Sequence, residues 1–135
     1  MCVENGGVER ARRMTKKAKP KVLVVDDERV IADTLAIILN QHGFDASPVY
    51  TGTAAVERAR AVRPDLVISD VIMPDMNGIE AAINIRRLLP SCKILLFSGQ
   101  AATADLLESA REQGHEFEIL AKPVHPQDLL AKLRG

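Results

Sequence analysis

The chain has 135 residues, of which 47% are hydrophobic and 27% charged, with 18 basic and 18 acidic side chains. This length suits one domain of ordinary size, and the composition excludes a collagen-like, low-complexity or wholly disordered chain. No apolar run has the length of a membrane span, and the first residues lack the apolar stretch of a secretory signal. We therefore expect a cytoplasmic protein without membrane contact, and the balanced charge gives no reason to expect direct DNA binding.

Residues 1–20 differ in composition from the rest of the chain. Residues 1–21 hold seven basic side chains against two acidic ones and show almost no apolar periodicity. Such a segment has no face to bury, so we predict a basic, flexible leader over 1–20 and one domain over 21–135. A solvated tail without function is the simplest interpretation. Met14 is an alternative natural start, because the opening MTKKAKPK would be unremarkable.

From Lys21 onward, short apolar runs alternate with amphipathic segments. In chain order, these runs and segments predict a strand over 21–25, a helix over 29–42, a strand over 44–49, a helix over 53–62, a strand over 66–69, a helix over 79–89, a strand over 93–97, a helix over 101–113, a strand over 118–121 and a helix over 126–133. In the first helix the apolar stripe expected to face the core consists of Val30, Ile31, Leu35 and Ile38, and Thr53 is expected to cap the second helix.

Five strand-helix alternations predict an α/β fold in which a doubly wound, five-stranded parallel sheet carries helices on both faces. Parallel connections of this kind are almost always right-handed. Two right-handed windings give the strand order 2-1-3-4-5, which is the flavodoxin-like arrangement.

Polar side chains follow four of the predicted strands at the points where these strands end. Asp26 and Asp27 follow the first strand, Asp70 the third, Ser98 the fourth and Lys122 the fifth. Open parallel sheets place their sites at these carboxyl ends. The first and third strands are adjacent in the predicted order, so we expect the three aspartates to converge.

Three converging carboxylates repel one another unless a cation compensates them. Two such charges ~4 Å apart repel by about 4 kcal/mol at an effective dielectric constant of about 20. Oxygen ligands, with water in the remaining positions, suit Mg²⁺ better than zinc or copper, and the two cysteines, Cys2 and Cys92, lack zinc-type spacing. The Ser98 hydroxyl and the Lys122 ammonium can bind the oxygens of a transferred phosphoryl group. The pattern therefore predicts a magnesium-dependent site that handles phosphoryl groups.

Each of these residues also has a purely structural interpretation. Taken alone, Asp26 and Asp27 are better explained as a cap of the following helix, and Asp70 is explained equally well as a turn residue. Ser98 and Lys122, taken alone, are ordinary loop residues. Their coincidence at the same end of four strands favours the site.

Four motifs make residues 21–135 resemble the receiver domain of bacterial response regulators of two-component signal transduction. These motifs are VLVVDDE at 22–28, LVISDVIMPDMNGIE at 66–80, ILLFSG at 94–99 and LAKP at 120–123. The resemblance implies that Asp70 is the phosphoacceptor and Asp27 a direct Mg²⁺ ligand. It also implies that Asp26 is a ligand through water or a positioning acid, and that the backbone carbonyl of Ile72 completes the protein's share of the coordination.

The same resemblance implies a phosphorylation-controlled switch. Ser98 stands where the family has its switch Ser or Thr, and Lys122 where it has its phosphate-pairing lysine. Asp70 would accept a phosphoryl group from the phosphohistidine of a sensor histidine kinase or a phosphotransfer protein. The chain would not be an enzyme beyond promoting its own phosphotransfer and a slow autodephosphorylation, for which the apolar Ile72 is the expected reason. Only nine residues follow Pro126, so we expect a stand-alone receiver that signals to a downstream protein through contacts.

One position departs from the family pattern. Many receivers carry Tyr or Phe three residues before the lysine, whereas this chain has Ile119 there. Strand alternation puts Phe117 on the same face as Ile119 but farther from Ser98. We therefore expect the usual aromatic coupling to be absent.

Three other classes of protein were weighed against this interpretation. A phosphatase resembling the haloacid dehalogenase family would need Asp-x-Asp after the first strand, where this chain has Asp26, Asp27 and Glu28. A receiver-like interaction module that is never phosphorylated is disfavoured by the intact acids, Ser98 and Lys122. A flavin-binding protein is disfavoured because no Ser/Thr/Gly-rich phosphate loop follows the first strand and aromatic residues make up 3% of the chain.

Overall fold

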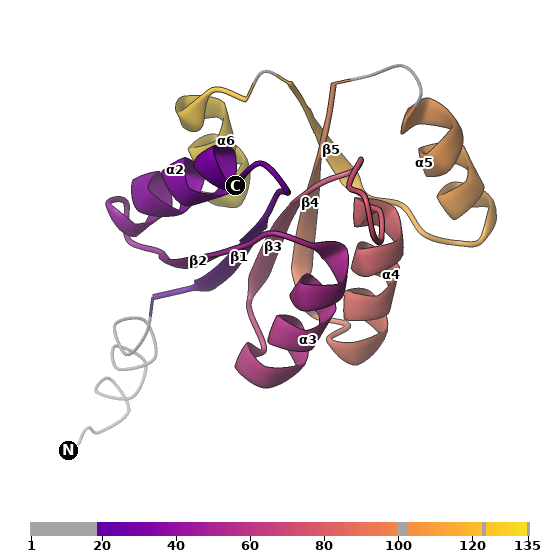
Figure 1. Cartoon of the computed structure of the whole chain (residues 1–135), viewed down its shortest axis with the longest axis horizontal. Coiled ribbons are helices and arrows are strands. Elements are labelled where there is room, and N and C mark those ends of the chain that lie inside the picture. The colour runs from indigo at the N-terminus through magenta and orange to yellow at the C-terminus, as the bar shows by residue number, and fades with distance from the viewer. Residues whose placement is uncertain (1–18, 100–102, 123, 135) are drawn as a thin grey trace.

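The computed structural model describes residues 19–99, 103–122 and 124–134, in which strands and helices alternate along the chain (Figure 1). The elements are β1 (Lys21–Val25), α2 (Arg29–Asn40), β2 (Asp45–Val49), α3 (Gly52–Val62), β3 (Leu66–Asp70), α4 (Gly78–Leu88), β4 (Lys93–Ser98), α5 (Thr103–Glu112), β5 (Glu118–Ala121) and α6 (Pro126–Arg134). Every predicted strand and helix is present, with boundaries that differ by at most two residues at each described end. The predicted leader, up to residue 18, lies outside the described residues.

The five strands form one parallel sheet in the order β2-β1-β3-β4-β5, which confirms the predicted α/β topology. The register brings the carboxyl ends of neighbouring strands level with one another. The pairs at this edge are Val25 with Val49, Val25 with Ser69, Asp70 with Phe97, and Ser98 with Ala121. Residues that follow these pairs therefore share one edge of the sheet.

Helices cover both faces of the sheet (Figure 1). α2 and α6 lie on one face, where their leucines and alanines pack against Val22, Val24 and Ile68. α3, α4 and α5 lie on the other face and pack against Leu23, Val25 and other strand residues of opposite parity. The alternation of side chains along each strand thus supplies two cores, and the sheet between them is buried on both sides.

The buried stripe of α2 was predicted with the wrong phase. Of the four residues expected to face the core, Val30 is 78% exposed, Ile31 and Ile38 are partly buried, and Leu35 is buried. The buried residues of this helix are Ala32, Leu35, Ala36 and Leu39. This stripe presents two alanines to the sheet, so the helix approaches the sheet more closely than a stripe of branched residues would allow.

The predicted cap of the second helix was also wrong. Thr51, and not Thr53, precedes the first turn of α3, and its side chain accepts a hydrogen bond of 3.0 Å from the backbone N–H of Ala54. Two threonines separated by one glycine offer the same local signal, and the turn after β2 decides between them. Within the described residues, no helix combines the length and the apolar character that crossing a membrane requires.

Candidate functional site

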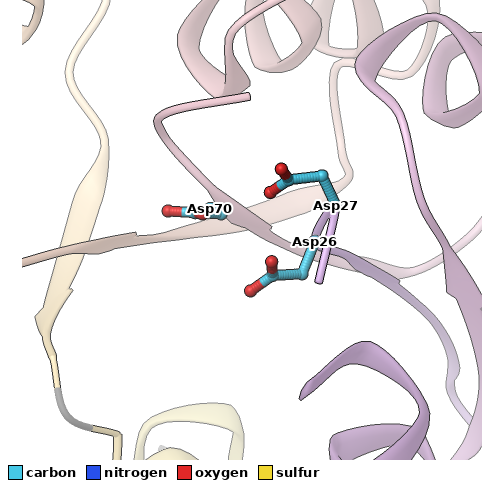
Figure 2. A group of neighbouring side chains, drawn as sticks. All are labelled: Asp26, Asp27 and Asp70. Carbon is cyan, nitrogen blue, oxygen red and sulfur yellow. The ribbon is translucent and has the colours of Figure 1, made fainter. Parts of the chain in front are cut away.

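Three carboxylates meet at the carboxyl edge of the sheet. Asp26 and Asp27 follow β1, Asp70 is the last residue of β3, and one oxygen from each lies within 4.8 Å of the others. Figure 2 shows the three carboxyl groups directed toward one region at the strand ends. Asp26 and Asp70 are buried, whereas Asp27 is exposed. The predicted convergence of the aspartates is therefore confirmed.

Asp26 is the most deeply buried acid of this cluster. Its Oδ1 atom accepts a hydrogen bond of 2.9 Å from the backbone N–H of Glu28, while Oδ2 has no hydrogen-bond partner among the described residues. Burial raises the pKa of Asp26, and the neighbouring carboxylates of Asp70 and Asp27 raise it further, against the lowering effect of the Glu28 N–H.

The donor set of this cluster fits a divalent cation. Buried polar atoms in native structures nearly always have a partner, and a cation held among the three acids would supply one to the Oδ2 atom of Asp26. It would also offset the repulsion between the carboxylates. Carboxylate oxygens without sulfur or imidazole suit Mg²⁺, and an acidic cluster of this kind is typical of such a site.

The backbone around Asp70 is held from several directions. The Ser69 hydroxyl donates a hydrogen bond of 2.9 Å to the carbonyl oxygen of Asp70, and the N–H of Val71 donates one of 3.3 Å to the carbonyl of Phe97. Gly78 approaches so closely that a Cβ atom there would lie 2.0 Å from the Asp70 carbonyl oxygen. The chain therefore needs glycine at 78, because any side chain would push α4 away from the end of β3.

The start of α4 is fixed by a capping box as well. The side chain of Asn77 accepts a hydrogen bond of 2.8 Å from the N–H of Glu80, and the Glu80 side chain accepts one of 3.3 Å from the N–H of Asn77. The roles of Ser69 and Gly78 were not predicted from the sequence. The motif at 66–80 contains turn residues, but which of them touches the Asp70 backbone depends on how α4 returns to the sheet.

The ammonium group of a lysine lies beside Asp70. The Nζ atom of Lys122 lies 3.1 Å from Oδ1 of Asp70, and the two side chains are 31% and 12% exposed. Lys122 directly follows β5, and its backbone N–H donates a hydrogen bond of 3.2 Å to the carbonyl of Ser98 at the end of β4. Asp70 is thus a member of the acidic cluster and also the partner of a lysine.

Comparison with known proteins agrees with this arrangement. Residues 22–134 match the response regulator receiver domain. The chain belongs to this family. Receiver domains are phosphoacceptors of two-component systems rather than enzymes of the ordinary kind, and the cluster of Asp26, Asp27 and Asp70 is typical of their Mg²⁺ site.

Two relatives of this chain have the same sequence identity to it but differ in how much of their own length it covers. The DNA-binding response regulator MtrA of Mycolicibacterium paratuberculosis is 32% identical over 117 residues, which cover 87% of this chain and 51% of MtrA. The chemotaxis protein CheY of Thermotoga maritima is 32% identical over 114 residues, covering 84% of this chain and 93% of that protein. The chain spans about half the length of MtrA but nearly the whole length of CheY.

Solved structures show the same fold. The CheY-like receiver domain protein of Methanospirillum hungatei superposes with a TM-score of 0.78 at 26% identity and covers 87% of this chain and 92% of its own. The chemotaxis protein CheY4 of Vibrio cholerae superposes with a TM-score of 0.77 at 29% identity, covering 87% and 98%.

Ser98 and Ile72 are the two other residues of the predicted receiver site, and they lie on a neighbouring strand end and in the loop after Asp70. Ser98 ends β4, one residue beyond Phe97, which pairs with Asp70. Ile72 lies two residues beyond Asp70 in the loop before α4, and its side chain is 46% exposed. The structure therefore brings together the three acids and Lys122, and it sets Ser98 on the neighbouring strand end. The chemical roles assigned to all six residues stay predictions.

Proposed function

We propose that this receiver domain is a phosphorylation-controlled switch that accepts a phosphoryl group onto Asp70. The donor is the phosphohistidine of a sensor histidine kinase or of a phosphotransfer protein. The observation that carries the proposal is the position of Asp70, whose carboxylate contacts Lys122 at 3.1 Å and lies within 4.8 Å of the two other acids. A nucleophile that contacts a cationic side chain and belongs to a cation-binding cluster is suited to phosphoryl transfer.

In the proposed step, a carboxylate oxygen of Asp70 attacks phosphorus. An O–P bond forms, the P–N bond to the donor histidine breaks, and the histidine nitrogen keeps the electron pair. The Lys122 ammonium, already beside Oδ1, donates hydrogen bonds to the phosphoryl oxygens as charge moves onto them. The hydrogen bond from Ser69 and the close approach of Gly78 keep the Asp70 backbone in place during the transfer.

Asp26, Asp27, Asp70 and the backbone carbonyl of Ile72 would hold Mg²⁺ in this proposal. When bound, Mg²⁺ supplies positive charge that lowers the repulsion between the acids and the incoming phosphoryl oxygens. Asp26, buried and held by the Glu28 N–H, acts as the fixed acid of the pair. Asp27 is exposed and would contribute its carboxylate to the cation from the solvent side.

The aspartyl phosphate formed at Asp70 carries the signal in this proposal. An aspartyl phosphate brings a charge of roughly −1.5 to −2 next to Ser98, whose hydroxyl turns toward the phosphoryl oxygens and donates a hydrogen bond. Movement at the end of β4 then passes to α5 and β5, and a downstream protein detects the changed surface by direct contact. We propose that residues 21–135 suffice for this cycle, with the leader over 1–20 dispensable.

The experiment that tests the proposal is labelling with a small acyl phosphate in the presence of Mg²⁺. Mass spectrometry should show one added phosphoryl group, located on the peptide that contains Asp70. Asp70→Asn should abolish labelling, whereas the matched control Asp45→Asn, an exposed aspartate at the opposite end of β2, should be labelled like the wild type. Equal labelling of Asp70→Asn and the wild type would refute the assignment.

A further inference from the structure

The loop between β3 and α4 carries one of the proposed Mg²⁺ ligands. Residues 71–77 form this loop, which begins directly after Asp70. The N–H of Gly78 donates a hydrogen bond of 2.7 Å to the carbonyl of Val71 and so joins the two ends of the loop. The carbonyl that the proposed function assigns to the cation belongs to Ile72, whose side chain is 46% exposed. The position of this carbonyl therefore depends on what holds the rest of the loop.

Asp75 ties the middle of this loop to the first turn of α3. Its Oδ1 atom accepts a hydrogen bond of 3.2 Å from the N–H of Gly52, and its Oδ2 atom accepts one of 3.1 Å from the N–H of Thr53. The first N–H groups of a helix have no partner within the helix, and the helix dipole also favours a carboxylate at this end. One side chain from a distant segment therefore satisfies two donors of α3 and uses both of its oxygens to do so.

A second contact brings the backbone of the same loop onto the same helix end. Gly52 is buried, and a Cβ atom built there would lie 2.4 Å from the carbonyl oxygen of Met76 and 2.9 Å from its Cβ atom. Met73 adds an apolar anchor, because its side chain belongs to the buried core cluster that also contains Ala55 of α3. The loop is therefore docked on α3, and Asp75 provides the charged part of this attachment.

The alternative interpretation of Asp75 is an ordinary helix cap. However, α3 has a cap of its own, since the Thr51 side chain accepts a hydrogen bond of 3.0 Å from the N–H of Ala54. Asp75 reaches the same turn from a segment 22 residues away along the chain, so its two hydrogen bonds fix the loop as well as the helix. Asp75 lies three residues beyond Ile72, and a restraint at one of these positions limits movement at the other.

We propose that Asp75 is a positioning residue for the Mg²⁺ site. By holding the loop on α3, it keeps the backbone at Ile72 in place for the cation, while its own carboxylate stays bound to α3. This inference rests on the proposed function, in which three acids and the Ile72 carbonyl hold Mg²⁺. Linkage between two equilibria is reciprocal. A cation that binds better to the docked loop must therefore also hold the loop more firmly on α3.

The first test compares the Mg²⁺ affinities of the wild type, Asp75→Ala and Thr51→Ala by titration calorimetry. Asp75→Ala should weaken binding about three- to tenfold, which is less than is typical for residues that support a metal ligand directly, because the Met73 anchor remains. Thr51→Ala removes the cap from the same turn of α3 but leaves the loop attached, so it should keep the wild-type affinity. A wild-type affinity in Asp75→Ala, or equal losses in the two variants, would overturn the inference.

The charge of Asp75 also attracts a cation from a distance, and salt separates this attraction from positioning. At about 1 M KCl the Debye length is about 3 Å, so charges that are not in contact are largely screened. The ratio between the affinities of the wild type and Asp75→Ala should persist under these conditions. Asp75→Asn, which keeps one acceptor oxygen, should lose less affinity than Asp75→Ala, and it replaces Asp75→Ala in all comparisons if that variant does not fold. A loss that disappeared in salt would show that Asp75 acts by its charge alone and would overturn the inference.

Amide hydrogen exchange measures the reciprocal effect. Saturating Mg²⁺ should slow exchange at the N–H groups of Gly52 and Thr53 in the wild type, because the bound cation holds the loop on α3. The same addition should leave their exchange unchanged in Asp75→Ala. The N–H of Arg63, which is bonded to the Ala59 carbonyl at the other end of α3, is the control and should respond less. Exchange at Gly52 and Thr53 that did not respond to Mg²⁺ in the wild type would contradict the inference.

These experiments distinguish a failure of this inference from a failure of the proposed function. Neither the affinity nor the hydrogen exchange requires a phosphoryl group. A wild type that binds Mg²⁺ but is not labelled at Asp70 would refute the proposed phosphotransfer, and the two measurements would still decide the role of Asp75. Labelling at Asp70 together with an unchanged Mg²⁺ affinity in Asp75→Ala would refute the role of Asp75 alone.

Discussion

Two of the strands that carry the candidate site, β3 and β5, differ in character. All five residues of β3 are buried, and β3 lies between β1 and β4 in the middle of the sheet. β5 is an edge strand that pairs only with β4, and none of its four residues is fully buried. Asp70 therefore stands on one of the best-packed strands of the domain, whereas Lys122 follows one of the least packed.

This difference indicates which part of the site is fixed and which part responds. Segments with few buried apolar contacts open at a lower free energy than the core. Asp70 and Asp26 are buried and held by the core before any phosphoryl group arrives, so they need no rearrangement at the moment of transfer. The strand that carries Lys122, and the neighbouring α5, can shift when charge is added at Asp70.

The largest expected effect is on the free energy of unfolding, which we compare for one substitution in β3 and one in β5. Ile68→Ala in β3 should lower the free energy of unfolding by about 2–5 kcal/mol, because Ile68 is 0% exposed. Ile119→Ala in β5 removes the same atoms from a partly buried position and should cost clearly less. Urea denaturation of both variants gives the comparison. Equal losses would show that β5 is packed as firmly as β3.

The next effect distinguishes the contributions of Asp26 and Asp27 to Mg²⁺ binding. Asp27→Asn should weaken Mg²⁺ binding about tenfold more than Asp26→Asn, because Oδ1 of Asp26 is already engaged with the Glu28 N–H and Asp27 is exposed to the solvent. Titration calorimetry measures both affinities. Lys122→Ala is the control from the other side of Asp70 and should not weaken binding. Equal affinities in the two Asn variants would remove the distinction between the acids.

A smaller effect concerns how phosphorylation of Asp70 changes the surroundings of β5, the less packed strand. Phe117 and Ile119 both contact the same core cluster, as strand alternation predicted. The Phe117 ring is covered by the Arg86 guanidinium, whose Cζ lies 4.2 Å from the ring centroid, and it stacks with the His115 ring at 6.4 Å. A ring held from both α4 and the loop before β5 is poorly placed to move when Ser98 turns.

We therefore expect phosphorylation or a phosphate mimic to perturb the amide signals of Ser98 and α5 more than the ring signals of Phe117. Two-dimensional NMR before and after addition of the acyl phosphate makes this comparison. Arg86→Gln is a useful companion, because it removes the cation above the ring and should make the Phe117 signals more responsive. A large change at Phe117 with unchanged α5 signals would contradict the expectation.

The sequence predicted the strands and the carboxyl-edge residues well because both depend on local pattern. Continuous apolar runs identified β1, β3 and β4, and chirality rules then ordered the sheet. The convergence of Asp26, Asp27 and Asp70 followed from that order. What local pattern could not predict was the contact of one segment with another.

The wrong phase of α2 and the role missed in the sequence have the same cause, which is contact between segments distant in the sequence. α2 contains both alanines and branched apolar residues, so two phases of the helix are compatible with the sequence, and packing against the sheet selects the one with Ala32 and Ala36 buried. Gly78 looks like an ordinary turn glycine in the sequence. Its role depends on the Asp70 carbonyl, which another segment brings next to it.

The smallest effect concerns the loop after Asp70, which is tied to α3 on the well-packed side. Asp75 accepts hydrogen bonds from the N–H groups of Gly52 and Thr53, at 3.2 Å and 3.1 Å. The Thr53 hydroxyl, followed by backbone N–H groups including those of Met76 and Gly52, lowers the pKa of Asp75 below its ordinary value. A carboxyl group whose pKa is lowered by folding stabilises the protein above its unfolded pKa, about 4, and loses that contribution as the pH falls.

Asp75→Asn should therefore lower the urea midpoint slightly at pH 7, because asparagine offers one acceptor oxygen in place of two and carries no charge. The difference from the wild type should shrink as the pH falls below about 4, where the Asp75 carboxylate of the unfolded chain begins to take up a proton. Asp33→Asn is unsuitable as a control because Asp33 binds the Tyr50 hydroxyl, whereas the exposed Asp45 serves. A difference between Asp75→Asn and the wild type that stayed constant from pH 7 into the acid range would show that the charge of Asp75 contributes nothing, and that the loop is held to α3 by its shape alone.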